Sequence, residues 1–426
     1  MNKRTKTTLR RWCLYGWTFA KWTMAASAIG VVCGLIGTMF HFGVHEVTAF
    51  RGTHPWVLYL LPLAGFVIVS FYKLTETDGL GTDDIIDAVH AGKRLPILLL
   101  PAIFFGTVLT HLCGGSAGRE GAALQMGGTI GQCMGRTFRL DDRDLRVATL
   151  AGMAAFFSAL FGTPLAATVF AIMVISIGVL YHVALYPSLL AALVAYGVSV
   201  RLGVEPTRFT VAVPDQSVGM FVRVAALGVL CALVSILFCK LMHGAGHLMK
   251  RIKNPWLRVI CGGFAVIALT WVFGTDYNGA GMDIVTRAIE QKTVAVPWAF
   301  LLKLVFTAVT LAAGFKGGEV VPSFFVGATF GCAVSPLLGL PVGFGAAIGL
   351  AAVFCGVTNC PVASTLLAVE LFGAEGMLYF ALACCLSYML SGYQGLYSSQ
   401  TILYSKLKAQ FINVHTNAYH AGEKTE

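Results

Sequence analysis

The sequence carries little charge for its length. Only 12% of its 426 residues are Asp, Glu, Lys or Arg, whereas soluble domains carry about 25%. Residues 147–200 and 320–369 contain none of these four types, and 57% of the chain is hydrophobic. A water-soluble core could not hide this much apolar surface. We therefore predict an all-α integral membrane protein, in which each uncharged run is long enough for two crossings of roughly 20 residues.

The sequence also lacks the residue clusters from which metal centres and hydrolytic enzymes are built. Its 12 cysteines are scattered without CxxC spacing, so we interpret them as small hydrophobic residues. No Ser-His-Asp cluster is recognisable. An intramembrane enzyme acting on a lipid phosphate, with Arg119 and Glu120 as its site, is an alternative from another class. Such an enzyme would need several convergent polar groups, which the uncharged runs do not supply. We therefore predict no enzyme activity, no metal and no cofactor.

The net charge of +10 comes from basic residues beside apolar spans. These residues are Lys3, Arg4, Lys6, Arg10, Arg11, Arg136, Arg139, Arg143, Arg146, Lys240, Lys250, Arg251, Lys253 and Arg258. Their placement follows the positive-inside rule better than it fits nucleic-acid binding. We expect a multi-pass protein of the cell (inner) membrane with a cytoplasmic N-terminus. The first apolar run imitates a secretory signal, but so many spans follow that an uncleaved first helix is expected.

The apolar segments are interrupted, and the chain repeats itself. Pro and Gly break the long apolar runs, which predicts helices that stop part-way, where they face protein or a watery cavity. GLGTDDIIDAV from Gly79 resembles GAGMDIVTRAI from Gly279, 200 positions later. TPLAATVFAI from Thr163 resembles CPVASTLLAV from Cys360. Repeats with broken helices in corresponding positions point to a transport site at the repeat interface.

We divide the chain accordingly into four segments. They are a basic N-terminal segment (residues 1–23), two membrane repeats (24–200 and 219–395), and the end of the last helix with a short polar tail (396–426). The number of crossings in each half is too loosely defined to decide between parallel and inverted repeats.

The glycine-rich breaks correspond between the halves. Those at 79–81 and 114–121 match those at 279–281 and 314–318. A helix that begins just after such a break presents unpaired N–H groups and the positive end of its dipole. Several such starts that converge within the membrane would bind an anion without a full positive charge, so the anion could also leave.

Glu120, in the GREG segment at 118–121, falls at one of these predicted helix starts. Its carboxylate can occupy an anion site itself, and protonation makes it neutral and lets it leave. Proton and anion would then compete for one place, which couples their movements. Alternatively, Glu120 pairs with Arg119 or caps its own helix. Ionisable groups in membrane segments are functional by default, which favours the first interpretation.

These motifs resemble those of the CLC anion channels and transporters. GREG followed by AALQMGGTIG resembles the glutamate gate of that family, and GLG at 79–81 lies where the family has its first anion-binding loop. GFKGGEVVPSFFVGATFG at 314–331 resembles the third motif, and Tyr397 resembles the late tyrosine whose hydroxyl faces the central anion. The resemblance covers about residues 24–405. It implies an inverted repeat of tilted, uneven helices and a homodimer with one pore per subunit.

Three features indicate a branch of the family. Chloride members carry GSGIP in the first loop, where this chain has Leu80 in place of the serine. Chloride/proton exchangers carry a second, inner glutamate, at a position aligned with Val174. Glu319 stands where chloride members have an apolar residue. All three resemble the fluoride branch, CLC-F, whose members export fluoride in exchange for protons. The resemblance therefore implies a fluoride/proton antiporter of the plasma membrane; a chloride channel or chloride/proton exchanger is the alternative.

The resemblance also implies the site. Glu120 would be the gating and proton-coupling glutamate, and Glu319 the candidate proton relay in place of the absent inner glutamate. The implied anion-binding residues are Gly79, Leu80, Gly81, Gly118, Arg119, Gly121, Val320, Val321, Phe324 and Tyr397. Leu80 and Val321 depart from the branch, which commonly has methionine and a hydroxyl residue there.

Four further polar residues have two interpretations each. Glu370 could relay protons or make a structural hydrogen bond. Lys316 could pair with Glu319 or lie apart from it. Asp83 and Asp283 occupy matched positions, and capping of the following helices explains both without a role in transport.

Overall fold

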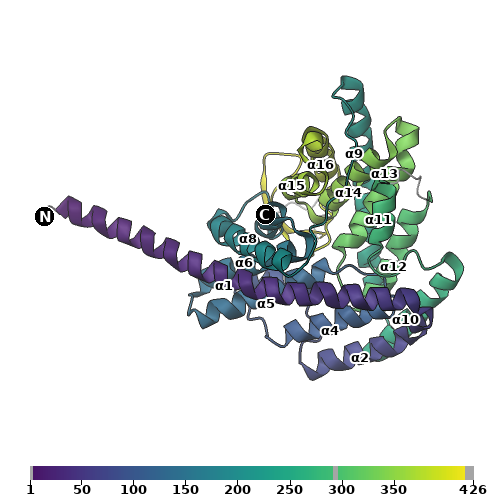
Figure 1. The fold of residues 1–426 in the computed structure, drawn as a ribbon, viewed down its shortest axis with the longest axis horizontal. Helices are drawn as coiled ribbons and strands as arrows, with labels where there is room; N and C mark the ends of the chain where they lie inside the picture. The colour runs from purple at the N-terminus through teal and green to yellow at the C-terminus, as the bar shows by residue number, and fades with distance from the viewer. Residues whose placement is uncertain (1–2, 291–295, 418–426) are drawn as a thin grey trace.

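The computed structural model describes residues 3–290 and 296–417 (Figure 1). The side chains of Lys3, Arg4, Lys6 and Arg10, and the end of the polar tail from residue 418, lie outside the described part. The chain is mostly helical, as predicted, with one small sheet that the sequence did not predict.

Within residues 3–290 and 296–417, two sets of eight helices follow one another. The first set is α1 (Lys3–Thr53), α2 (Leu61–Leu74), α3 (Thr82–Ala91), α4 (Leu99–Leu112), α5 (Glu120–Thr137), α6 (Asp142–Phe161), α7 (Pro164–Met173) and α8 (Leu185–Arg201). The second set is α9 (Val218–Met249), α10 (Pro255–Phe273), α11 (Met282–Glu290), α12 (Ala299–Ala313), α13 (Val320–Leu338), α14 (Val342–Thr358), α15 (Pro361–Phe372) and α16 (Met377–Leu390). Short 3-10 turns η1 (Pro55–Leu60), η2 (His182–Ala184) and η3 (Ala374–Gly376) precede α2, α8 and α16.

The helices are uneven in length, as the interrupted apolar pattern predicts. Within the described residues, seven helical segments are long and apolar enough to cross a membrane. They are Arg11–Thr53, Pro55–Leu74, Asp142–Phe161, His182–Arg201, Val218–Met249, Pro255–Phe273 and Val320–Leu338. Six further apolar helical segments have 10–17 residues, too few to cross upright at about 20 residues per span. The fold is that of a multi-pass membrane protein.

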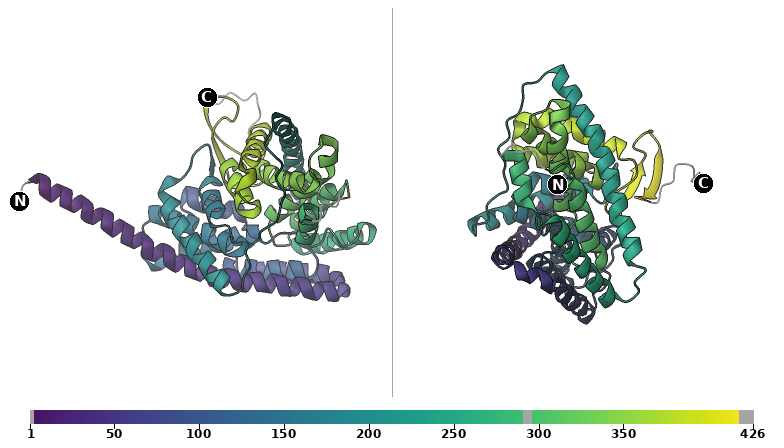
Figure 2. Two further views of the ribbon diagram at one scale, coloured as in Figure 1. Left: turned by 45° about the horizontal axis from the view of Figure 1, so that its top comes forward. Right: turned by 90° about the vertical axis from the view of Figure 1, so that its right-hand side faces the viewer.

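α1 is one continuous helix of 51 residues, roughly 75 Å long at 1.5 Å per residue. Its first turns project from the body of the molecule (Figures 1 and 2). Trp12 and Trp17 on this projection are exposed, whereas Trp22 is buried against the body. The helix thus extends well before residue 24, because nothing in the sequence interrupts it there.

The predicted breaks lie directly before helix starts. α3 begins at Thr82 and α11 at Met282, while α5 begins at Glu120 and α13 at Val320. Helix starts therefore recur 200 residues apart, which confirms the correspondence read from the glycines.

Backbone pairing between the halves shows how they are related. The N–H of Gly118 donates to Gly318 O at 2.7 Å, and the N–H of Gly318 donates to Gly118 O at 2.8 Å. The N–H of Ser116 donates to the Thr310 hydroxyl at 3.1 Å. Its counterpart Lys316 donates its N–H to the Thr110 hydroxyl at 3.2 Å. Because equivalent residues exchange equivalent bonds, an approximate two-fold axis passes between the two glycines.

Close helix crossings bury α5 and α13. A Cβ on Gly152 of α6 would overlap the carbonyl oxygen of Gly127 on α5. In the second half, a Cβ on Gly349 of α14 would overlap the carbonyl oxygen of Gly327 on α13. Small residues let helix backbones approach in membrane proteins, where packing replaces the hydrophobic driving force. The glycines therefore fix the position of the two helices whose starts meet at the centre.

The small sheet ties the end of the chain to the first half. It consists of β1 (Ser176–Ile177), parallel to β2 (Thr401–Tyr404), and β3 (Phe411–His415), antiparallel to β2. Buried Gln400, just before β2, donates through Nε2 to Val174 O and Thr358 O, both at 3.0 Å. The segment that carries Tyr397 is therefore held by helix ends from both halves.

Glu370 and Asp83, whose roles the sequence left open, both make structural hydrogen bonds. Glu370 of α15 accepts the N–H groups of Leu165 and Ala166 at 3.1 and 2.8 Å, and so caps α7 of the other half. Asp83 does not cap α3 as expected: its carboxylate accepts the N–H of Ser399 at 3.0 Å. The capping carboxylate is Asp84, which accepts the N–H of Gly81 at 2.9 Å.

The glycine crossing yields a test. Gly152→Ala should destabilise the protein by about 1–3 kcal/mol, the usual cost of overpacking, and lower the melting temperature of the purified protein. Gly244→Ala on α9 is the matched control, because a Cβ there meets no atom within 4 Å. Equal melting temperatures for the two variants would contradict the close crossing.

Candidate functional site

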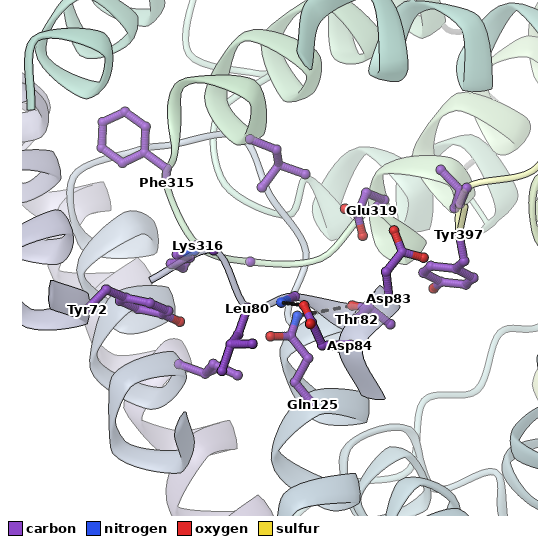
Figure 3. Close-up of a pocket in the computed structure, with 16 residues that line it drawn as sticks. Tyr72, Leu80, Thr82, Asp83, Asp84, Gln125, Phe315, Lys316, Glu319 and Tyr397 are labelled. Atoms are coloured by element: carbon purple, nitrogen blue, oxygen red, sulfur yellow. Dashed lines mark hydrogen bonds between the residues drawn. The ribbon is translucent and has the colours of Figure 1, made fainter. Parts of the chain in front are cut away.

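A cavity of about 260 Å³ opens between the first loop, the segment before α13 and the segment that carries Tyr397 (Figure 3). Its lining includes Gly79, Leu80 and Gly81 from the loop before α3, and Glu319 and Tyr397 from the second half. The structure thus brings together five of the predicted site residues. Glu319, Tyr397 and Asp83 lie close together on one side, and Lys316 and Tyr72 lie apart from them (Figure 3).

The first loop, residues 79–81, lines the cavity, but its backbone amides are not free to donate hydrogen bonds to an anion. Gly79 adopts a positive φ of 82°, which favours glycine. The N–H of Leu80 donates to Thr77 O at 3.2 Å, and the N–H of Gly81 is taken by Asp84. These amides are engaged within the protein, so an anion here would need donors from elsewhere.

Asp84 also pairs with Lys93, in the loop after α3, at 2.5 Å. This hydrogen bond raises the pKa of the Lys93 ammonium above its ordinary value. The carboxylate therefore fixes the loop on two sides, which keeps the entry to α3 in one conformation.

Glu120 is the first residue of α5 and is 1% exposed. Its Oε2 accepts the N–H of Arg119 at 2.9 Å. Its Oε1 lies 3.5 Å from Arg119 Nε and has no hydrogen-bond partner among the described residues. Burying a carboxylate with one oxygen unpartnered is costly. Glu120 is therefore ion-paired with Arg119, as one alternative from the sequence expects, yet its Oε1 is left without a well-formed hydrogen bond.

Glu319 comes directly before α13, the helix matched to α5. Its Oε2 is buried and has no hydrogen-bond partner among the described residues. A Cβ on Gly121 would lie 3.3 Å from this oxygen and 2.7 Å from Gly318 Cα. Glycine at 121 thus lets the Glu319 carboxylate pack against the start of α5, one residue from Glu120.

Tyr397 brings a third unpartnered group to this region. The side chain is 3% exposed, and its hydroxyl has no hydrogen-bond partner among the described residues. Glu319, Asp83 and Glu120 all lie within electrostatic range of it. Buried polar groups are nearly always hydrogen-bonded, so this cluster is suited to a polar species that the protein atoms alone do not satisfy.

The remaining predicted residues lie at the helix starts outside the cavity lining. Gly118 forms the cross-repeat pair, and a Cβ there would lie 2.7 Å from Glu120 Oε2. Val320 and Val321 are buried in the first turn of α13. Phe324 packs edge-on against Phe354 at 5.1 Å between ring centroids.

Several contacts at the site were not predicted. Gln125 of α5 donates to the Thr82 hydroxyl at 3.0 Å, and both residues line the cavity. Lys316 does not pair with Glu319: its ammonium lies 4.1 Å from the centre of the Tyr72 ring. A second partner of Arg119 is His41 on α1, with Nη1 and Nδ1 3.0 Å apart. No sequence pattern links these residues, because they meet only through the packing of α1, α2, α3 and α5 around the helix starts.

The fold and the site define a membrane protein with two related halves and a polar cavity beside broken helices. Residues 63–392 match the family model described as voltage gated chloride channel. The chain therefore belongs to the CLC family, whose inverted repeat of tilted and broken helices it shares.

Two relatives are especially similar. The chloride/fluoride channel protein of Pseudomonas syringae pv. tomato is 39% identical over 399 residues, covering 91% of this chain and 88% of the relative. The crystal structure of a CLC-type fluoride/proton antiporter matches with a TM-score of 0.88 and 32% identity, covering 91% of this chain and 99% of that one. A slow cyanobacterial Cl⁻/H⁺ antiporter, with a TM-score of 0.75 and 18% identity over 87% of this chain and 94% of its own, shares the fold.

The unpartnered hydroxyl yields a prediction. Tyr397→Phe removes no protein hydrogen bond, so we expect the melting temperature of the purified protein to stay unchanged. The control is Tyr379→Phe on α16, where the hydroxyl donates to Asp215 O at 3.0 Å. Losing that bond should cost about 0.5–1.5 kcal/mol and lower the melting temperature. Equal destabilisation in both variants would show that the Tyr397 hydroxyl has a structural partner.

Proposed function

We propose that this protein exports fluoride from the cytoplasm in exchange for protons across the cell (inner) membrane. Membership of the CLC family and the similarity to a CLC-type fluoride/proton antiporter and to a chloride/fluoride channel protein support the proposal. The observation that carries it is Glu120, a buried carboxylate with one unpartnered oxygen at the start of α5. The role is transport, and it needs neither an enzyme activity nor a cofactor.

In this mechanism Glu120 and the anion take turns. The starts of α5 and α13 meet at the Gly118–Gly318 pair, so both helix dipoles direct partial positive charge to one region. The carboxylate of Glu120 is an anion on a short tether and occupies that region when no halide does. A proton neutralises Glu120 and releases it, and fluoride then enters. Competition for one place couples the two ions.

Glu319 is the proposed proton relay. An inner glutamate is absent, since Val174 is apolar and fully buried. Glu319 lines the cavity and packs its Oε2 beside Gly121, next in the chain to Glu120. A proton that enters from the cavity side can therefore reach Glu319 before Glu120. Tyr397 offers a hydroxyl donor to fluoride, a strong hydrogen-bond acceptor, at the same end.

The anion path we propose runs through the remaining residues implied by the family. The first loop (Gly79, Leu80, Gly81) shapes one side, while Gly118, Arg119, Gly121, Val320, Val321 and Phe324 form the helix starts on the other. With Leu80 and Val321 lacking donor atoms, Tyr397 is the main donor in this proposal.

The export direction follows from energetics. An inside-negative potential contributes only about 2.3 kcal/mol per charge at 100 mV, and uptake of a proton adds the pH gradient. We further propose repeats over residues 24–200 and 219–395, a homodimer embedded in the lipid bilayer, and a cytoplasmic N-terminus, in line with the basic residues before the first span.

The proposal is tested with protein reconstituted into liposomes. Fluoride efflux, followed with an ion-selective electrode, should drive proton uptake, and fluoride should move faster than chloride. Glu120→Gln should abolish proton movement and Glu319→Gln should weaken it, by roughly 100-fold for a residue that transfers protons directly.

The control is Glu375→Gln, which changes an exposed carboxylate before α16 and should transport normally. Chloride flux equal to fluoride flux in the unmodified protein would favour the chloride alternative. Persistent proton coupling in Glu120→Gln would contradict the role of Glu120.

A further inference from the structure

Arg119 lies between the side chains of Glu120 and His41, and only Glu120 has a role in the proposed mechanism. On one side its Nε is 3.5 Å from Glu120 Oε1, a long ion pair that lies outside hydrogen-bond geometry. On the other side its Nη1 is 3.0 Å from Nδ1 of His41 on α1. The guanidinium is therefore shared between a buried carboxylate and an imidazole, with the better geometry towards the imidazole.

The bond to His41 fixes the protonation state of the ring. A guanidinium donates hydrogen bonds and never accepts them, so Nδ1 of His41 must present a lone pair. His41 is then neutral with its proton on Nε2. A protonated His41 has no acceptor to offer and would repel Arg119, so the observed contact exists only while the ring is unprotonated.

The surroundings connect His41 to solvent. The ring is half-buried, and it stacks on the ring of His45, one turn further along α1, at 6.5 Å with planes 6° apart. His45 is exposed, with the Glu46 carboxylate 3.7 Å from its Nδ1. Arg119 is the charged group that faces His41 from the segment before α5, and Glu120 lies behind it. From α4, His111 lies within electrostatic range of Arg119, but its Nδ1 is bonded to Thr107 O.

We propose that His41 is a positioning residue that keeps Arg119 from pairing fully with Glu120. While His41 is neutral, it holds the guanidinium back, and Oε1 of Glu120 stays free to take up the proton. When His41 is protonated the restraint is lost, Arg119 turns to Glu120, and the carboxylate is held in its charged form. Turnover then falls in acid. This inference rests on the proposed function, because it assigns His41 to the proton step at Glu120.

The test compares two substitutions of His41 over a pH series, with equal pH on both sides of the liposome membrane. His41→Gln keeps an acceptor for Arg119 but cannot titrate, so its fluoride flux should match the unmodified protein at pH 7.5 and resist acid. His41→Ala removes the acceptor, so its flux should be low at every pH, by about tenfold for the loss of a hydrogen bond to a charged group. His45→Gln, which leaves the Arg119 contact intact, should keep the pH profile of the unmodified protein.

Two results would overturn the inference: identical pH profiles for His41→Gln and the unmodified protein, or full activity of His41→Ala at pH 7.5. If the protein moves chloride and not fluoride, the proposed function fails, and the same comparison made with chloride still tests His41. Nitrogen-15 NMR tests it without transport: the His41 signal, assigned by its loss in His41→Gln, should show an unprotonated Nδ1 at neutral pH. A protonated Nδ1 would refute the proposal.

Discussion

The backbone pair between Gly118 and Gly318 is the constraint on which the rest of the structure depends. Two hydrogen bonds of 2.7 and 2.8 Å join equivalent points of the two halves. They hold the starts of α5 and α13 together in the interior of the protein, where buried backbone groups must find partners within the chain. A side chain at Gly318 would force the two helix starts apart, since a Cβ there would overlap Gly121 N, and a Cβ on Gly118 would lie 2.7 Å from Glu120 Oε2. Because the pair is short, Glu120 and Glu319 come to lie at one junction, where each has a buried carboxylate oxygen.

This arrangement makes function depend on what the junction leaves unsatisfied. Glu120 Oε1, Glu319 Oε2 and the Tyr397 hydroxyl are buried without hydrogen-bond partners among the described residues. By contrast, Glu370 is fully used as the cap of α7, and the first-loop amides of Leu80 and Gly81 are engaged within the loop. The contrast separates groups that make structural hydrogen bonds from the groups that we propose interact with ions. It also explains why a chain with so few charged residues keeps two carboxylates near its centre.

Much of this could be predicted from the sequence, because a repeat is a periodic signal. The glycines at an offset of 200 marked the starts of α3, α5, α11 and α13, and GREG placed Glu120 at the first residue of α5. Features that depend on side-chain direction or distant packing could not be predicted. The sequence predicted that Asp83 caps α3, but the capping carboxylate is that of its neighbour Asp84. The sheet joins residues 176–177 with 401–415, and His41 meets Arg119 across 78 positions. The continuous α1 was missed because basic residues and Trp mark a membrane surface without ending a helix.

The central claim is that the Glu120 carboxylate and the anion occupy the same place in turn. The most direct measurement is a pair of cryo-electron microscopy structures of the protein in lipid, one without halide and one with saturating fluoride, both at neutral pH. We expect the structure without halide to show Glu120 at the junction of α5 and α13, bonded to the N–H of Arg119. We expect the structure with fluoride to show the side chain withdrawn, with density for an ion in its place. A Glu120 side chain in the same position in both structures, with ion density elsewhere, would rule out alternating occupancy.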